Sequence, residues 1–400
     1  FQVPAPSLTD ATPAGLSVVN PMPPEPPAFA VSQVDRPEPA FSRDMCMEFA
    51  IGSIGKVLGP MFDIVDTYKV RVRLPDEPLM LVDRIIRVEG EKGSLKSGKV
   101  VTEHDVLPGA WYLDGDRCPV CISIEAGQAD LFLCSYLGID LAVKGKRSYR
   151  LLDAVAKFHA GLPKPGDTIR YEIEIDRFIN QGETYLFFFH FNGYIKDRHI
   201  ISMRNGCAGF FTDKEVKDSG GIILTAEETA PVPGTLTPAW KDLVPYFGTG
   251  ETYSLSDDQV NALRQGDPGR AFGGVFKGKT LSPSLVIPGG RMKLVDRVLE
   301  IDPAGGRYGL GSIRAQADIH PDDWFLTCHF VDDKVMPGTL MYECCMHTLR
   351  ILTMRMGWVT DQPGVRCEPV PEIASVLKCR GPVTVETKHV FYVVDIKEIG

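Results

Sequence analysis

The pattern of hydrophobic and polar positions along the chain predicts strands in several places and long helices in only two. Residues 168–176, 183–195 and 199–212 are rich in β-branched and aromatic side chains with partial alternation, which is typical of strands. Residues 125–138 and 340–357 instead place apolar side chains at intervals of three and four and run out at a glycine. That spacing predicts a helix with one apolar face in each segment.

Three further segments are assigned from composition. Residues 1–40 contain many prolines and predict a stiff, extended linker rather than a packed fold. A helix is expected over 43–58, and a short one over 254–265, where Ser256 is the expected N-cap before two aspartates. The chain opens without Met in the proline-rich tract, so we expect it to be a piece of a longer protein.

The chain contains an internal repeat. LPDEPLMLVDRIIRVE (74–89) matches IPGGRMKLVDRVLEID (287–302) at a constant offset of 213 residues. Further along, Pro119 matches Pro337 and Glu125 matches Glu343, and the offset has become 218. Repeat 1 therefore lacks five residues that repeat 2 has, namely Thr327, Cys328, His329, Phe330 and Val331.

The order of elements within each repeat predicts the fold. Each repeat has two early strands, an irregular stretch, one apolar helix and then long strands. One buried helix wrapped by an antiparallel sheet is the hot-dog arrangement, so two copies predict a double hot dog of the α+β class. The expected divisions are a linker (1–42), hot dog 1 (43–215), a second linker with a short helix (216–284) and hot dog 2 (285–400).

The second hot dog is expected to be incomplete. TIRYEIEID (168–176) matches TKHVFYVVD (387–395), but the sequence stops at Gly400, before counterparts of the strands over 183–195 and 199–212. The missing C-terminal strands should leave a sheet edge unpaired.

Composition and charge exclude several classes of function. The apolar fraction of 44% is that of an ordinary globular protein, and no run of eighteen apolar residues predicts a membrane span. The net charge of −9 argues against nucleic acid as a partner, but it would not hinder an acidic carrier protein if a local basic patch exists. The N-terminus lacks the plan of a signal peptide. Among ten cysteines, Cys118 and Cys121 form a lone CxxC pair, so packing in a reducing cytoplasm is the expected role.

The segment WFLTCHFVDDKVMPGTLMYE (324–343) carries candidate chemistry. Removing water from a 3-hydroxyacyl thioester needs a base for the α-proton, donors for the developing enolate and an acid for the departing hydroxyl. His329 suits the first task, and a helix-start N–H at Gly338 suits the second. A carboxylic acid whose pKa is raised by burial in an apolar tunnel suits the third.

These residues carry a resemblance. CHFVDDKVMPGTLMYE resembles the active-site stretch of bacterial β-hydroxydecanoyl-carrier-protein dehydratases, in which an Asp or Glu follows the histidine by fourteen residues, as Glu343 follows His329. SYRLLDAVAKFHAGLPKPGDTIRYEIEID, ETYLFFFHFNGYI and MRNGCAGFFTD resemble the dehydratase region of polyunsaturated fatty acid synthases and related multidomain lipid synthases. The likeness covers about residues 45–400.

The resemblance implies a function. It implies dehydration of a (3R)-3-hydroxyacyl chain, held on the phosphopantetheine of an acyl carrier protein, to a trans-2-enoyl chain, without metal or cofactor. Other domains of the same synthase are the implied partners, a homodimer is possible, and isomerisation to a cis-3 product stays open.

The resemblance also implies the site residues. In such dehydratases one hot dog supplies the histidine and the helix-start amide, and the other supplies the carboxylate. Repeat 2 would supply His329 and Gly338, where repeat 1 has Val120 in place of the glycine. Repeat 1 keeps Glu125, the expected acid, whereas Glu343 would face a repeat without a histidine and be a remnant.

Alternatives remain at this point. His329 could be a satisfied core residue, Glu125 could favour a helix dipole at a helix start, and Gln128 could hold its carboxyl group. His347 follows Glu343 by four residues and could bind metal with a third ligand. The competing functions are an acyl-thioester hydrolase and a non-catalytic structural or carrier-docking module.

Overall fold

The structure, a computed structural model, describes residues 38–218, 220–237, 253–358 and 361–400. Most of the predicted proline-rich linker, residues 1–37, therefore lies outside the described residues. The described part, from Glu38 to Gly400, is one compact unit and contains both repeats.

The N-terminal segment of this unit is helical. The helix predicted over 43–58 forms as two helices, α1 (Arg43–Ile51) and α2 (Ile54–Leu58), followed by the 3-10 helix η1 (Pro60–Thr67). Gly52 and Ser53 interrupt it, and the Ser53 side chain accepts the N–H of Lys56 as the N-cap of α2. We call residues 43–73, from the start of α1 to the end of the chain that follows η1, the N-terminal lobe.

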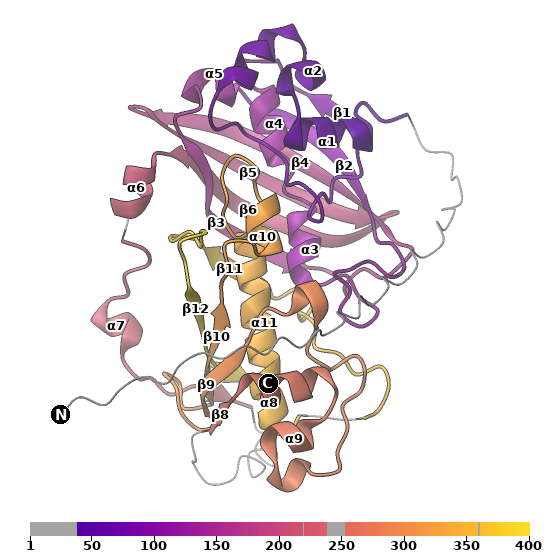
Figure 1. Ribbon diagram of the computed structural model, residues 1–400, viewed down its shortest axis with the longest axis vertical. Coiled ribbons are helices and arrows are strands. Elements are labelled where there is room, and N and C mark those ends of the chain that lie inside the picture. Colours follow the sequence, from indigo (N-terminus) through magenta and orange to yellow (C-terminus); the bar gives the residue numbers. More distant parts are fainter. Residues whose placement is uncertain (1–37, 219, 238–252, 359–360) are drawn as a thin grey trace, which may run out of the picture. The chain divides into compact units, whose positions relative to one another are not determined.

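A seven-stranded antiparallel sheet belongs mainly to repeat 1 (Figure 1). The predicted long strands form where expected, and their inward positions are buried because polar and apolar residues alternate. The strand order is β1-β2-β4-β5-β6-β3-β11. The strands are β1 (Arg84–Glu89), β2 (Gly98–Asp105), β3 (Ser148–Phe158), β4 (Thr168–Gln181), β5 (Thr184–Ile195), β6 (Arg198–Phe211) and β11 (Ala374–Lys378).

The helical region inside this sheet departs from the prediction. The prediction of a single helix over 125–138 is wrong. The chain instead forms three short helices, α3 (Val120–Glu125), α4 (Asp130–Tyr136) and α5 (Ile139–Val143). At the break, a Cβ added to Gly127 would lie 2.8 Å from the Phe191 ring and 2.9 Å from the Tyr171 ring. The chain approaches the sheet too closely there for a side chain, and Glu125 ends a helix instead of opening one.

The second sheet has four antiparallel strands in the order β12-β10-β9-β8. These are β8 (Tyr253–Leu255), β9 (Arg297–Asp302), β10 (Ser312–Asp318) and β12 (His389–Asp395). The predicted helix of repeat 2 forms as α11 (Gly338–Arg355), which packs against β10, β12 and α3 (Figure 1). A two-stranded parallel pair joins β7 (Thr235–Leu236) to β13 (Glu398–Ile399).

The two sheets follow the predicted double hot dog, with an incomplete second copy. By the repeat, β9, β10, β11 and β12 correspond to β1, β2, β3 and β4. In repeat 1, β5 and β6 lie between β4 and β3, whereas no strand among the described residues lies between β12 and β11. The strand β11 instead continues the first sheet by pairing with β3. Phe391 and Val393 on β12 are more than half exposed, as expected beside an open edge.

The segment between the repeats contributes to the second half of the unit. It contains α6 (Asp213–Asp218), α7 (Ala226–Thr229), β8, α8 (Asp257–Arg264), α9 (Pro268–Phe272) and η4 (Gly274–Phe276). Ser256 is the N-cap of α8 as predicted, in a capping box with Gln259. Val260 and Leu263 are fully buried in the same apolar cluster as Ile351 of α11, so this segment packs on repeat 2.

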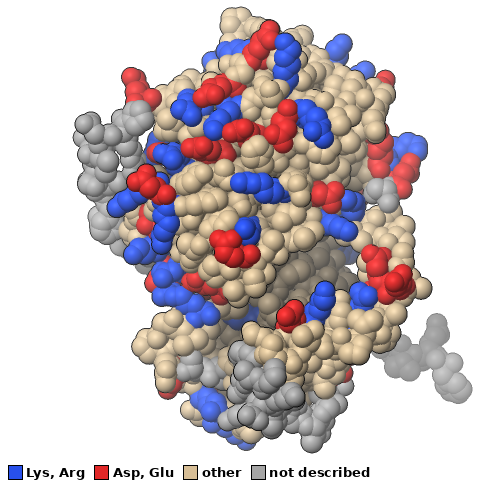
Figure 2. Space-filling model, turned by 180° about the vertical axis from the view of Figure 1, so that it is seen from behind, with Lys and Arg blue, Asp and Glu red and all other residues tan. Residues whose placement is uncertain are grey.

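Two surface properties bear on partners. On the face shown in Figure 2, Lys and Arg side chains are interspersed with Asp and Glu, so the described residues form no large basic patch there. Within the ranges that the structure describes, no helix has the length and apolar character needed to cross a membrane.

Candidate active site

His329 follows the short helix α10 (Trp324–Cys328) and begins a tight loop that leads to α11. The Val335 N–H donates to the His329 carbonyl at 2.9 Å, and the His329 Nδ1 lies 2.9 Å from the Val335 carbonyl oxygen. Because a carbonyl oxygen can only accept, Nδ1 carries the proton and donates. The Nε2 atom is left with a free lone pair, as a base requires.

Glu125, from repeat 1, faces this nitrogen. Its Oε1 lies 3.6 Å from His329 Nε2, and the Thr339 hydroxyl donates to its Oε2 at 2.5 Å. Both side chains are about nine-tenths buried. Glu125 is the last residue of α3, where the helix dipole disfavours a carboxylate, so the dipole does not account for it. The structure thus brings together the pair that the sequence predicted.

Gly338 is the first residue of α11, so its N–H has no acceptor within the helix. It lines the same cavity as His329 and Glu125. A Cβ at this position would lie 3.1 Å from the Cys379 Sγ, which leaves little room for a side chain. The corresponding Val120 begins α3 in repeat 1.

The candidate site opens into a cavity of about 150 Å³ between the two repeats. Gln128 is on its wall and accepts a long hydrogen bond of 3.5 Å from the Tyr149 hydroxyl. The walls combine apolar side chains with a few polar groups, as ligand cavities usually do. The lining residues are Glu125, Gln128, Leu131, Tyr149, Arg150, Leu151, Leu152, Phe211, Glu215, Val216, His329, Val335, Met336, Gly338, Met341, Cys379, Arg380, Gly381 and Pro382.

Burial sets the charge state of the histidine. Desolvation lowers the pKa of His329 below its ordinary value of 6.5, although the nearby Glu125 carboxylate opposes that shift. The imidazole is therefore neutral near pH 7 and able to take a proton.

Glu343, the second carboxylate of the motif, lies elsewhere. Its Oε2 accepts the N–H of Cys121 at the start of α3, at 2.9 Å, and its Oε1 is 3.4 Å from His347 Nε2. Burial works to raise the pKa of Glu343, but His347 and the Cys121 N–H outweigh it and leave the pKa below its usual value. The structure does not bring Glu343 to His329.

The structure places a third residue, Asp114, beside Glu343 and His347, the pair that the sequence offered as metal ligands. Ligand atoms of Asp114, Glu343 and His347 lie within 4.8 Å of one another, as three ligands of a cation would. However, Arg350 donates to both carboxylate oxygens of Asp114. Since a guanidinium already neutralises Asp114, we interpret these four residues as a buried charge cluster rather than a metal centre.

Sequence reasoning missed Thr339, whose hydroxyl holds Glu125. The residue stands directly after the predicted oxyanion donor in the MPGT run, but a threonine in the first turn of a helix is ordinary. Only the packing of α3 against α11 makes it a contact of the carboxylate.

Comparison with known proteins identifies the family. The sequence model of the FabA-like domain matches residues 74–204 and 287–400, which covers both repeats. The chain belongs to the FabA-like domain family. Each segment of the FabA-like match contains one of the two facing residues. Glu125 lies in the first segment and His329 in the second.

Relatives of this FabA-like chain include a much longer protein. That relative, a component of the polyunsaturated fatty acid synthase of Thraustochytrium sp., is 34% identical over 367 residues, which is 90% of this chain. The chain spans only 24% of the relative's length.

Solved structures give weaker likenesses. The dehydratase domain from the CurJ module of curacin polyketide synthase matches 78% of this chain and 84% of its own, at 7% identity and a TM-score of 0.33. Cj0977, a virulence protein from Campylobacter jejuni, matches 38% of this chain and 88% of its own, at 14% identity and a TM-score of 0.24. TM-scores this low do not establish a shared fold.

Proposed function

We propose that this FabA-like chain removes water from a 3-hydroxyacyl thioester, with His329 as base and Glu125 as acid. The observation that carries the proposal is the facing pair itself. A histidine Nε2 with a free lone pair and a carboxyl group lie 3.6 Å apart, from different repeats, in one buried cavity beside the start of α11.

The first step is proton transfer from carbon. His329 Nε2 takes the α-proton, and the electron pair of the broken C–H bond moves toward the thioester carbonyl oxygen. The N–H of Gly338 donates to this oxygen, and the start of α11 adds about half a positive charge there. Fixed dipoles aimed at growing negative charge are suited to stabilising an enolate-like transition state.

The second step expels the hydroxyl group. The electron pair returns to form the C2–C3 double bond, the C3–O bond breaks, and the Glu125 carboxylic acid protonates the departing oxygen to give water. His329 is then protonated and Glu125 ionised. Since the two groups are close, a proton can pass back between them and restore the starting state.

The substrate is proposed as a (3R)-3-hydroxyacyl chain on the phosphopantetheine of an acyl carrier protein, converted to the trans-2-enoyl chain. A relative named as a subunit of a polyunsaturated fatty acid synthase supports this assignment, because the name connects the chain with fatty acid synthesis. Other domains of a multidomain synthase are the proposed partners. No step of this mechanism uses a metal or cofactor.

The test is product analysis. The chain is incubated with a (3R)-3-hydroxyacyl carrier protein, and the acyl group is examined by mass spectrometry. Loss of one water with the thioester intact, abolished in His329→Ala, is the expected result. Free acid without an alkene would instead identify a thioester hydrolase. A carrier-bound substrate left unchanged, although the chain binds the carrier protein, would favour a docking module. A cis-3 product would add isomerisation by the same base.

A further inference from the structure

The loop that carries the candidate base is closed on itself. We call residues 329–335 the histidine loop. Besides the two contacts between His329 and Val335, the Phe330 N–H donates to the Asp333 carbonyl at 2.8 Å, and the Asp333 N–H donates back at 3.2 Å. The loop is therefore a small hairpin, and Asp332 and Asp333 project from its tip.

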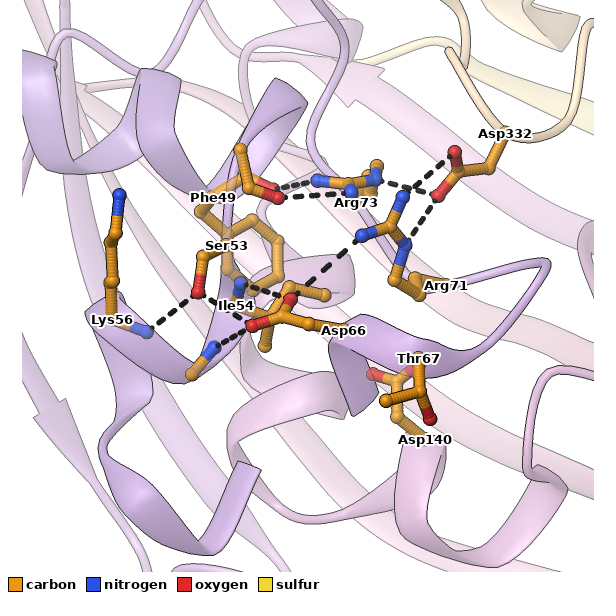
Figure 3. A network of polar contacts seen from close by, with 12 residues as sticks. Phe49, Ser53, Ile54, Lys56, Asp66, Thr67, Arg71, Arg73, Asp140 and Asp332 are labelled. Carbon is orange, nitrogen blue, oxygen red and sulfur yellow. Dashed lines mark hydrogen bonds and ion pairs between the residues drawn. The ribbon is translucent and has the colours of Figure 1, made fainter. Parts of the chain in front are cut away.

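Asp332 at this tip is bound by two arginines of the N-terminal lobe (Figure 3). Its Oδ2 accepts from Arg71 Nε at 2.8 Å and from Arg73 Nε at 2.7 Å, and its Oδ1 accepts from Arg71 Nη2 at 3.2 Å. The Arg73 side chain is fully buried, and that of Asp332 is 14% exposed. Charge-assisted hydrogen bonds at this depth are strong and directional.

The arginines are themselves held in place. Arg73 donates to the carbonyl oxygens of Phe49, at 2.9 Å, and Gly52, at 3.1 Å, where α1 ends. Between the arginines, the Val72 N–H donates to the buried Asp140 at 2.9 Å. These contacts hold the two guanidinium groups that the lobe presents to the histidine loop.

Arg71 has a second link to the lobe. Its Nη1 lies 3.8 Å from Asp66, whose carboxylate accepts the N–H groups of Ile54, at 2.8 Å, and Gly55, at 3.1 Å, in the first turn of α2 (Figure 3). The start of α2, Arg71 and the tip of the histidine loop therefore form one polar network.

A second anchor holds the other side of the tip. Arg150, on β3 of the first sheet, donates to both carboxylate oxygens of Asp333, at 2.5 and 3.1 Å. The histidine loop belongs to repeat 2, while all three arginines precede that repeat in the chain. The same ion pairs therefore fix the loop and set its distance from Glu125.

We infer that Arg71, Arg73 and Asp332 are positioning residues that aim His329 Nε2 at the substrate and at Glu125. The inference rests on the proposed function. Arg71 and Arg73 lie just before residue 74, where the match to the FabA-like domain begins. The N-terminal lobe is thus an accessory element that holds the histidine loop of the opposite repeat in place.

The test is Asp332→Asn, which keeps the shape of the side chain but removes its charge. The expected result is a fall in kcat of about 10²-fold, since displacing a catalytic group by 1 Å can cost that much, with KM changed by less than about threefold. Asp332→Glu should recover part of the loss because it restores the charge.

The matched control is Glu103→Gln. Glu103 accepts from Arg84 Nε at 2.7 Å and is 16% exposed, so the pair resembles Arg73–Asp332 but lies on β1 and β2. Its kcat should stay near the parent value. If Asp332→Asn lowers the melting temperature as Glu103→Gln does but leaves kcat unchanged, Asp332 is only structural and the inference is wrong.

Two further measurements keep the outcomes distinct. If Asp332→Asn fails to fold, Arg71→Gln removes one of the two guanidinium groups at a partly exposed position, and the same drop in kcat is expected. His329→Ala is assayed in parallel. Retained activity in His329→Ala overturns the proposed function, whereas an inactive His329→Ala with a fully active Asp332→Asn overturns only the positioning role.

Discussion

Exchange for glutamine should lower the activity at one of the two motif glutamates and the stability at the other. In Glu125→Gln the side chain keeps its length and can still accept the Thr339 hydroxyl, so the cavity should keep its shape. It loses the acidic proton that, in the proposed mechanism, protonates the departing hydroxyl. General acid catalysis is worth about 10²–10⁴-fold, so kcat should fall by that factor, or about 3–5 kcal/mol in the barrier.

In Glu343→Gln the loss should appear in stability. The amide oxygen can still accept the Cys121 N–H, but the charged contact with His347 in the buried cluster is lost. Disturbing one member of such a buried network costs about 1–3 kcal/mol. The melting temperature should fall, while kcat of the folded fraction should change by less than about tenfold, because Glu343 does not reach His329.

The assay measures kcat and KM with a (3R)-3-hydroxyacyl thioester, together with thermal unfolding of each variant. Comparable losses of kcat in both variants, or a loss confined to Glu343→Gln, would refute the pairing of His329 with Glu125. Glu343→Gln shares the chemistry of the exchange and so serves as the control for Glu125→Gln.

Two further predictions concern the base and the oxyanion donor. The acid limb of kcat/KM against pH should lie below 6.5, because burial lowers the pKa of His329. The unfolded chain binds this proton more readily than the folded one, so the contribution of His329 to stability should be lost as the pH falls below about 6.5. Gly338→Ala should lower kcat by up to about 10²-fold, because the added Cβ crowds Cys379 and displaces the helix-start N–H. Adding Cys379→Ala to this variant should restore part of the lost kcat. An unchanged kcat in Gly338→Ala would show that the Gly338 N–H has no part in the mechanism.

Several features could be predicted because they are properties of the sequence alone. The change of offset between the repeats showed that repeat 1 has no counterpart of His329, which limits the chain to one such histidine. The same alignment put Glu125 in the opposite repeat, where the structure places it 3.6 Å from the ring. Periodicity also predicted α11 nearly to its ends.

Other features depend on residues far apart in the chain. The break after Glu125 follows from the rings of Tyr171 and Phe191, which lie on distant strands, so the helical spacing over 125–138 could not show it. The anchors of the histidine loop join residues 259 and 261 positions apart. Arginines and aspartates are common on protein surfaces, and nothing in their local pattern distinguishes a buried brace from a solvated pair.

The two motif glutamates show why matching positions in a repeat need not share a role. The free-energy cost of burying a carboxylate must be offset by hydrogen bonds or an opposite charge wherever the carboxylate occurs. In repeat 1 Glu125 meets Thr339 and a histidine whose Nε2 is free, and this arrangement can exchange protons with a substrate. In repeat 2 Glu343 has no histidine from the opposite repeat and is instead held by His347 of its own helix and the N–H of Cys121. That arrangement holds the carboxylate within the interface between α3 and α11. In the proposed mechanism, the five-residue segment absent from repeat 1 therefore decides which glutamate acts as the acid.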